Sequence, residues 1–317
     1  MTLHVVFDTI CLDIVNFIQL NISSIIFFER INIKMIRLLI DSSSDFTAEE
    51  RKERNLAYVP LSITFDTETF KDGIDITQDD FYKKLVSEST FPKTAQPSPE
   101  AFLNEFNKAK EAGDEIIAIL LSSSLSGTYQ SANIAKDMCD YDKIYLVDSL
   151  SATAIVDTMV DYAIKLINEG KSAPEIVEAL EDLRSRTTIY IGLDTLEYLY
   201  KGGRLNRATA AIGEIANLKP SVSVNREGSV VMYKKSIGKN KAIATIVNSI
   251  AANEPDPEFP FYTLYTLNTD NCEKLQAKIE KAGFKVKAMK HLGCTIGAHL
   301  GPNIYGVGYI AKKPQEL

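Results

Sequence analysis

The sequence predicts an α/β fold divided into two α/β domains, and three observations support this prediction. At 317 residues, the chain is longer than one typical domain. From Met35 onward, apolar runs of strand length alternate with helical segments, as in parallel strands joined by crossover helices. The second half is more mixed and includes a β-hairpin pattern. We place the two domains at residues 35–180 and 181–317.

The first half carries clear start and stop signals for its helices. Thr77 and Ser172 each precede a helical segment and have an acidic residue three positions later. A third helix begins at Ser98-Pro99 and is ended by Gly113. The predicted strands are the short apolar runs 36–41, 115–124 and 143–149, and the predicted helices are 77–89, 98–110, about 152–169 and 173–185.

The second half predicts a mixed sheet. Residues 221–236 alternate in polarity on both sides of Arg226-Glu227-Gly228, which is the pattern of a β-hairpin. The Gly202-Gly203 pair ends one short helix, and Gly283 ends another. The other predicted elements are strands at 188–193, 261–268, 285–293 and 306–310 and helices at 194–203 and 269–283.

The composition excludes some classes of protein. The chain is 45% hydrophobic and 24% charged, an ordinary balance for a soluble protein with a substantial core. A net charge of -7 argues against a general nucleic-acid-binding protein, because phosphate neutralisation needs a basic surface. The four cysteines, at 11, 139, 272 and 294, lack metal-ligand spacing. We expect them to be reduced and buried, as in a cytoplasmic protein.

Residues 1–34 are kept apart from the fold prediction. They are rich in Ile, Phe and Val, but no basic region precedes them, and Asp8, Asp13 and Glu29 interrupt the apolar runs. No uncharged stretch is long enough for a membrane helix. Because Met35 stands directly before the first predicted strand, we interpret 1–34 as an extension or a start codon assigned too early. An amphipathic surface helix is the alternative.

Three segments carry candidate binding residues. Ser126 in LLSSSLSGTYQSA (120–132) is placed to cap a helix whose free N–H groups favour an anion. Thr94 in KTAQPSP (93–99) precedes a turn in which two prolines could hold its hydroxyl in one place. His299 in GAHLGP (297–302) stands where glycines predict a turn that brings its ring against a ligand. Together they suit a bound carboxylate or a Ser-His hydrolase.

Motifs for other chemistries are missing. No G-x-S-x-G nucleophile elbow occurs, which argues against many hydrolases. Gly170-Lys171-Ser172 lacks the earlier glycine of a nucleotide-binding P-loop, because position 165 is Lys. No G-x-G-x-x-G follows a strand, and no metal-binding motif is present. The sequence therefore favours binding of a carboxylate without a cofactor or a metal.

From about Ile36 to the C-terminus, the chain resembles the DegV family of fatty-acid-binding proteins. Five collinear segments carry the resemblance: IDSSSD (40–45), KTAQPSP (93–99), SSSLSGTYQSA (122–132), DTLEYLYKGGRL (194–205) and IGAHLGP (296–302). The resemblance implies two α/β domains with a ligand tunnel between them, in which a long-chain fatty acid such as palmitate is buried. It also implies that a partner ATP-dependent fatty acid kinase converts the bound acid to an acyl phosphate for phospholipid synthesis. The chain itself is then a lipid-binding subunit and not an enzyme.

The resemblance implies roles for particular residues. Thr94, Ser126 and His299 are expected to hold the carboxylate. The backbone of the pocket is expected to be supported by Gly127, Gly297 and Ala298. The family usually has Ser after the threonine, and Ala95 stands there in this chain, so no auxiliary hydroxyl contact is expected at that position.

Two groups of basic residues are candidates for a docking surface. The KGGR pattern of the family makes Arg204 the candidate contact for the kinase or for the phosphate, or else a neighbour of the carboxylate head group, and Lys201 and Arg207 lie nearby. On the first assignment, Arg204→Glu impairs phosphorylation and leaves lipid binding intact. A second run, Lys234, Lys235, Lys239 and Lys241, also fits an ordinary solvated face, and we assign no role to any of its residues.

Simple energetics agree with a buried fatty acid. A palmitoyl-sized tail gains about 0.8 kcal/mol per CH₂, roughly 11 kcal/mol before ordering costs. A buried carboxylate needs hydrogen bonds to its oxygens, which two hydroxyls and an imidazole can supply. Because His⁺ binds an anion more strongly than neutral His, we expect binding to weaken as pH rises. The alternative is an autonomous serine-dependent acyl hydrolase that uses Ser126 and His299.

Overall fold

A parallel sheet forms the first half of the fold, as predicted. The computed structural model describes residues 35–88, 90–205 and 217–314, and the elements below belong to the compact unit Ile36–Leu317. The first sheet has the order β2-β1-β6-β7, and all its pairs are parallel. Its strands are β1 (Ile36–Asp41), β2 (Ala57–Val59), β6 (Glu115–Leu120) and β7 (Ile144–Asp148).

Alternating side chains of the first sheet build two different cores. On one face, Leu39 and Ala118 pack with Phe102 of α4 (Pro99–Ala112) and Ala132 of α5 (Thr128–Cys139). On the other face, Ile40 and its neighbours pack with α6 (Ala154–Asn168) and α7 (Ala173–Leu183) in the largest core cluster. The helix α2 (Ala48–Glu53) precedes β2, and short 3-10 helices cover Ser42–Ser44 and Arg184–Arg186.

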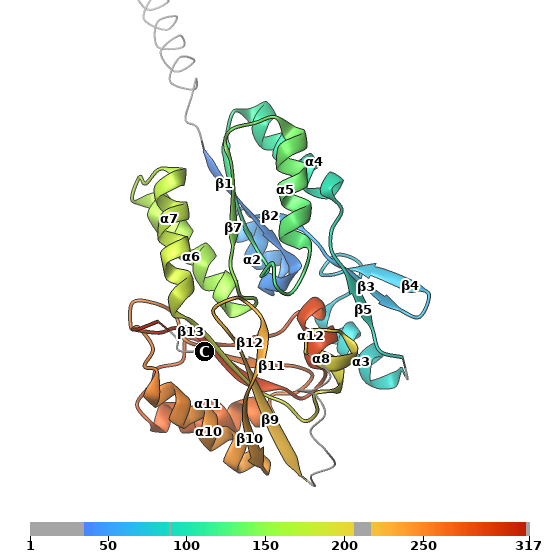
Figure 1. Ribbon diagram of the computed structural model, residues 1–317, viewed down its shortest axis with the longest axis vertical. Helices are drawn as coiled ribbons and strands as arrows, with labels where there is room; N and C mark the ends of the chain where they lie inside the picture. Colours follow the sequence, from blue (N-terminus) through green and yellow to red (C-terminus); the bar gives the residue numbers. More distant parts are fainter. Residues whose placement is uncertain (1–34, 89, 206–216, 315–317) are drawn as a thin grey trace, which may run out of the picture. The chain divides into compact units, whose positions relative to one another are not determined.

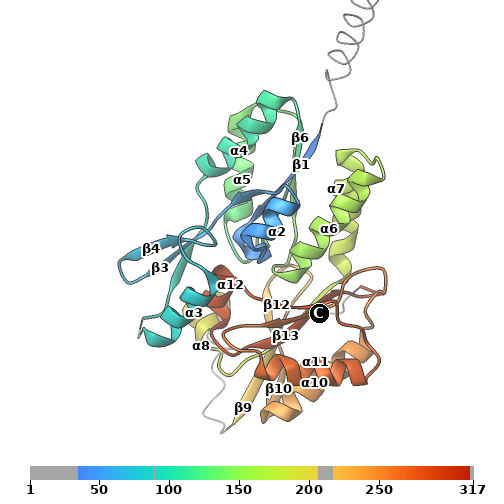
Figure 2. The ribbon, with the colours of Figure 1, turned by 180° about the vertical axis from the view of Figure 1, so that it is seen from behind.

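The second sheet is mixed, with the order β10-β9-β8-β13-β11-β12. Its strands are β8 (Thr187–Gly192), β9 (Leu218–Val224), β10 (Val230–Ile237), β11 (Tyr262–Tyr265), β12 (Ala288–His291) and β13 (Tyr305–Ile310). One face packs on α10 (Lys239–Ala252) and α11 (Asp270–Lys281), and the other contributes Ile189 and Ile191 to the largest core cluster. Figure 1 shows α4 and α5 beside the first sheet and α10 and α11 beside the second; Figure 2 gives the view from behind.

A small third sheet, which the sequence analysis did not anticipate, positions part of the site. It has the order β4-β3-β5, with β3 (Ser62–Phe65), β4 (Glu68–Lys71) and β5 (Lys93–Ala95). Phe65 of this sheet shares a core with Phe81 and Tyr82 of α3 (Gln78–Ser87) and with Ala298 of α12 (Cys294–Leu300). Strands of three and four residues leave too short a pattern to be distinguished from a loop by periodicity.

Most predicted elements are confirmed, with ends that shift by a few residues. Thr77 and Ser98 cap their helices through side-chain oxygens, Ser172 forms a capping box, and Gly113 ends α4 in the left-handed region. The predicted strand 115–124 ends at Leu120, because Leu121 donates its N–H to Asp41 instead of to the sheet. The helices α2 and α10 were not predicted.

Two local predictions are wrong. Ser126 does not cap α5: the N-cap is Gly127, and the Ser126 hydroxyl pairs with the Thr128 hydroxyl at 2.8 Å and accepts from the Thr128 N–H at 3.3 Å. Such local bonds compete with a capping bond. His299 lies in the last turn of α12 and not in a turn between glycines, because Gly297 is helical and Gly301 provides the stop.

The strands of the first sheet all precede residue 180, and those of the second sheet all follow it. Helix α7 ends at Leu183, and β8 starts the second sheet at Thr187. The exact boundary at residue 180 stays a prediction. Cys139, Cys272 and Cys294 are free and buried, as expected, and Cys11 lies outside the described residues, as do the whole of 1–34 and Arg207. Among the described residues, no helix combines the length and apolar character needed to cross a membrane.

Candidate functional site

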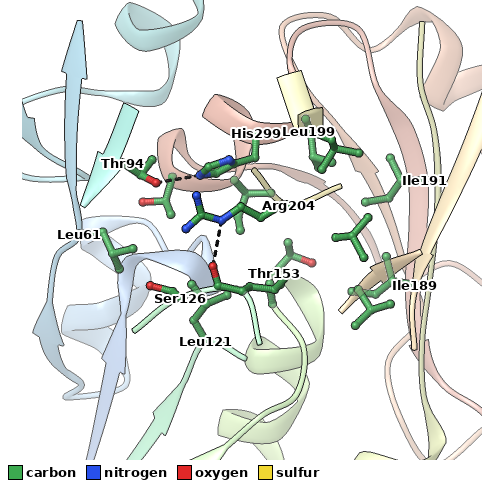
Figure 3. A pocket seen from close by; sticks show the side chains of 17 residues that line it. Leu61, Thr94, Leu121, Ser126, Thr153, Ile189, Ile191, Leu199, Arg204 and His299 are labelled. Atoms are coloured by element: carbon green, nitrogen blue, oxygen red, sulfur yellow. Dashed lines mark hydrogen bonds between the residues drawn. The ribbon is translucent and has the colours of Figure 1, made fainter. Parts of the chain in front are cut away.

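An apolar cavity of about 70 Å³ collects residues from both sides of the predicted domain boundary. Its apolar lining comes from the loops after β2, β6 and β7, from β8 to β10, and from α8 (Glu197–Lys201) and α12 (Figure 3). These apolar residues are Leu61, Leu121, Leu125, Ala152, Ile189, Ile191, Leu199, Val224, Val230, Ile296 and Leu300. The predicted carboxylate-binding residues Thr94, Ser126 and His299 line the same cavity.

Thr94 and His299 form the central polar contact of the cavity. The Thr94 Oγ1 and His299 Nε2 atoms lie 2.8 Å apart, although the two residues are 205 positions apart in the chain (Figure 3). Strand β5 presents Thr94 by pairing with β3, in a register that places Thr94 opposite Ile63. Helix α12 presents His299 and packs against β5. Three distant segments therefore bring two hydroxyls and one imidazole to one cavity.

Arg204 also lines this cavity, in addition to the three predicted residues. Its Nε donates to the Leu125 carbonyl at 3.0 Å (Figure 3). Its Nη1 donates to the Gly202 carbonyl at 2.6 Å. These bonds tie the guanidinium to the loop that carries Ser126. Burial lowers the pKa of Arg204 from its ordinary value, but an arginine remains charged at neutral pH. The cavity thus holds a fixed positive charge next to its hydroxyl groups.

The His299 ring is neutral at pH 7. Burial lowers the pKa of His299 to about 4, and repulsion from the Arg204 charge lowers it further in the same direction. Its Nδ1 is buried and has no hydrogen-bond partner within the described structure. The charged imidazole, which we expected to strengthen anion binding, is therefore not the form present at neutral pH. Arg204 supplies the positive charge instead.

This electrostatic arrangement predicts how His299 titrates. In the ligand-free protein, we expect the His299 side chain to stay neutral well below pH 6.5, with a midpoint near 4, because burial opposes its protonation. Removing the charge in Arg204→Gln should raise this midpoint, but burial should still hold it below the ordinary histidine value. NMR of the imidazole nitrogens measures both midpoints. A wild-type midpoint at or above the ordinary value contradicts the arrangement.

Two buried carboxylates fix the start of the helix that carries His299. The Gly293 N–H donates to Asp45 Oδ1 at 2.7 Å, and the Thr295 N–H and hydroxyl donate to Asp72 Oδ2 at 2.8 and 2.6 Å. The Ser42 hydroxyl lies 3.0 Å from that of Thr295. The IDSSSD segment thus holds α12 in place instead of contacting the cavity directly.

The anchoring of α12 predicts a loss of stability in Asp72→Ala. This change leaves the buried Thr295 N–H unpaired and leaves the Thr295 hydroxyl with Ser42 as its partner, which should lower the free energy of unfolding by about 1–3 kcal/mol. Chemical denaturation measures the loss. Asp75→Ala is the matched control, because Asp75 is exposed and accepts one bond from the Lys71 N–H. Equal effects of the two changes would count against a specific role for Asp72.

The backbone positions predicted to support the pocket lie behind its lining. Gly127, Gly297 and Ala298 are not among the lining residues. A Cβ at Gly297 would lie 2.3 Å from the Tyr82 hydroxyl, and one at Gly127 would lie 1.9 Å from Gln96 Oε1. These glycines allow close packing of neighbouring side chains. Their predicted support of a ligand stays a prediction.

Sequence reasoning missed two polar residues of the lining, Thr153 and Thr295. Thr295 lies within three residues of the IGAHLGP motif but carries no signal of its own. Thr153 lies where a helix was already expected, and its positive φ of 57° shows only in the structure. The apolar lining residues are spread over many elements, so no local pattern identifies them.

Comparison with known proteins identifies the family of this chain. The family model described as "Uncharacterised protein, DegV family" matches residues 35–312. A DegV domain-containing protein of Caldanaerobacter subterraneus is 36% identical over 284 residues, which cover 87% of this chain and 99% of that protein. A Staphylococcus aureus DegV domain-containing protein is 31% identical, over 88% of this chain and 98% of that protein.

Solved structures show the same fold. A structure described as fatty acid binding of a DegV family protein from Thermus thermophilus has a TM-score of 0.79 and 31% identity, and covers 87% of this chain and 99% of that one. A stearic-acid-binding protein of Eubacterium ventriosum has a TM-score of 0.79 and 25% identity, over 88% and 99%. The Streptococcus pneumoniae Fatty Acid Kinase (Fak) B3 protein loaded with linoleic acid has a TM-score of 0.75 and 23% identity, over 87% and 99%. The chain described here belongs to the DegV family.

Proposed function

We propose that this protein binds a long-chain fatty acid, such as palmitate, with its carboxylate at Thr94, Ser126 and His299. The observation that carries the proposal is the convergence of these three residues on one otherwise apolar cavity, with Thr94 and His299 only 2.8 Å apart. Similar structures from Thermus thermophilus and Eubacterium ventriosum are described as binding fatty acids, which supports the assignment.

Arg204 and a neutral His299 together suit a carboxylate. A neutral imidazole donates one hydrogen bond, and the Thr94 and Ser126 hydroxyls can donate two more. The nearby guanidinium balances the negative charge, which offsets much of the cost of removing a carboxylate from water. We therefore revise the expectation for Arg204→Glu. Because Arg204 lines the cavity, a negative charge there should weaken palmitate binding as well as any phosphorylation.

The acyl tail requires the cavity to widen. Pockets for drug-sized ligands span about 300–1,000 Å³, whereas this cavity measures about 70 Å³. Side chains along β8 to β10 must therefore move aside when a long chain enters. The total gain for a palmitoyl-sized tail, roughly 11 kcal/mol at about 0.8 kcal/mol per CH₂, exceeds the cost of rearranging a few side chains at about 0.5–1.5 kcal/mol each.

We infer that the protein acts in the cytoplasm as a non-catalytic subunit for a partner ATP-dependent fatty acid kinase. The kinase phosphorylates the bound carboxylate, and the resulting acyl phosphate enters phospholipid synthesis. This step needs an acid group that is fixed but reachable. Thr94, Ser126 and His299 line one cavity together with Arg204 of the KGGR segment. This arrangement supports a carboxylate that is held at a fixed position. Arg204 stays our candidate for a contact with the kinase or the phosphate.

The alternative, an acyl hydrolase that uses Ser126 and His299, is less well supported by the geometry. A hydrolase needs the imidazole bonded to the serine and oriented by a third group. Here His299 Nε2 pairs with Thr94, the Ser126 hydroxyl pairs with Thr128, and His299 Nδ1 has no partner in the described structure.

Two measurements test the proposed function. Gentle mass spectrometry of protein purified from cells should show a co-purifying fatty acid, and delipidated protein should bind palmitate in a titration. Sustained turnover of an activated acyl ester by the purified protein alone would favour the hydrolase. If folded, delipidated protein does not bind palmitate, the binding proposal itself is refuted.

A further inference from the structure

Thr153 adds a further polar group to the lining of the proposed fatty-acid cavity. Its side chain lines the cavity (Figure 3), and only 2% of the residue is exposed. Its Oγ1 is buried and has no hydrogen-bond partner within the described structure. A buried hydroxyl without a partner costs about 1–3 kcal/mol. The surrounding lining is largely apolar, so a ligand entering the cavity is the group that can complete this bond.

The backbone does not explain why a threonine stands here. Thr153 has φ 57° and ψ -136°, a conformation that is strained for a β-branched residue and easy for glycine. Two hydrogen bonds keep the backbone in this strained conformation. The Thr153 N–H donates to the Ser43 carbonyl at 2.7 Å, and the Thr153 carbonyl accepts from the Val156 N–H at 2.9 Å. The hydroxyl is thus aimed by a fixed backbone.

The start of α6 indicates which kind of ligand group fits. Thr153 is the N-cap residue of this 15-residue helix, but its side chain makes no capping bond. The first turn already contains the carboxylate of Asp157, which forms a buried ion pair with Lys290 at 2.6 Å. Asp157 does not line the cavity and is already paired with Lys290, so the start of α6 offers no counter-charge to a charged ligand group. A neutral oxygen, which can donate and accept a hydrogen bond, suits the position better.

We propose that Thr153 binds a hydroxyl group on the acyl chain and that the protein therefore takes hydroxylated long-chain fatty acids as a ligand class. The proposal rests on the proposed fatty-acid function, with the carboxylate at Thr94 and His299. Thr153 then acts as a specificity residue along the tail. The hydroxyl on the acyl chain forms one hydrogen bond with the Thr153 hydroxyl. A plain methylene at that position leaves the Thr153 hydroxyl without a partner.

The first test needs only the wild-type protein. Delipidated protein is titrated with stearate and with octadecanoic acids that carry one hydroxyl, moved stepwise along the chain. One narrow range of hydroxyl positions should bind about tenfold more tightly than its neighbours on either side, since one buried hydrogen bond is gained there. If every hydroxylated acid binds more weakly than stearate, with no preferred position, the proposal is overturned.

Variants at Thr153 provide the second test. In Thr153→Val, which keeps the shape but not the hydroxyl, the affinity ratio of the best hydroxylated acid to stearate should fall about tenfold. In Thr153→Ser, the ratio should be retained. A ratio that survives in Thr153→Val places the hydroxyl contact elsewhere and contradicts the assignment. Failure of stearate to bind at all refutes the fatty-acid function instead, so the two failures are distinguishable.

Discussion

Replacing His299 by alanine is expected to weaken palmitate binding about 100-fold, because a buried carboxylate loses one donor and Thr94 loses its partner. The expected loss follows from the 2.8 Å contact between Thr94 Oγ1 and His299 Nε2 inside the cavity. Titration of delipidated protein with palmitate measures it. If the proposed kinase partnership holds, the acid should also become a poor substrate for that kinase, since its carboxylate is no longer fixed.

His291→Phe is the matched control for His299→Ala. The His291 ring stacks between Tyr82 and Tyr265, with ring centroids at 5.1 and 4.6 Å, and it does not line the cavity. A phenyl ring keeps this stacking, so palmitate binding should persist. Should His299→Ala bind palmitate with unchanged affinity and still be used by the kinase, the role assigned to His299 is wrong.

The second large effect is expected from Gly202→Ala, a change outside the cavity lining. A Cβ at residue 202 would lie 2.2 Å from His299 Nδ1 and 2.9 Å from the Tyr198 carbonyl oxygen. The carbonyl belongs to the backbone of α8 and cannot move easily, so the imidazole must leave its present position, which disturbs its contact with Thr94. We expect palmitate affinity to fall about 100-fold, as for loss of the imidazole contact itself.

Two comparisons make the Gly202 prediction specific. Gly203→Ala adds a methyl group to the next residue, where no atom lies within 4 Å. Its φ of 74° costs about 1 kcal/mol of stability, but palmitate binding should be retained. In a His299→Ala background, Gly202→Ala should cause little further loss, because the clashing ring is gone. An additive loss in the double variant would show that Gly202 acts independently of His299.

Helix boundaries were predictable where local chemistry decides them. The Thr77 and Ser98 hydroxyls accept from N–H groups three residues away, and Ser172 donates to the Glu175 carboxylate. Gly113 adopts a positive φ that favours glycine. These interactions need no distant partner. The third sheet and the helical setting of His299 were missed, because short strands and a seven-residue helix depend on tertiary packing more than on their own periodicity.

The sequence by itself determined the α/β class, the parallel first sheet and the family resemblance. It also identified Thr94, Ser126 and His299 as candidate carboxylate-binding residues. Only the tertiary structure decided that Arg204 joins them, that the imidazole is neutral, and that the unpaired Thr153 hydroxyl lines the same wall. The physical reason is that caps and periodicity are set by near neighbours. Charge, burial and hydrogen-bond satisfaction depend on which distant segments pack together.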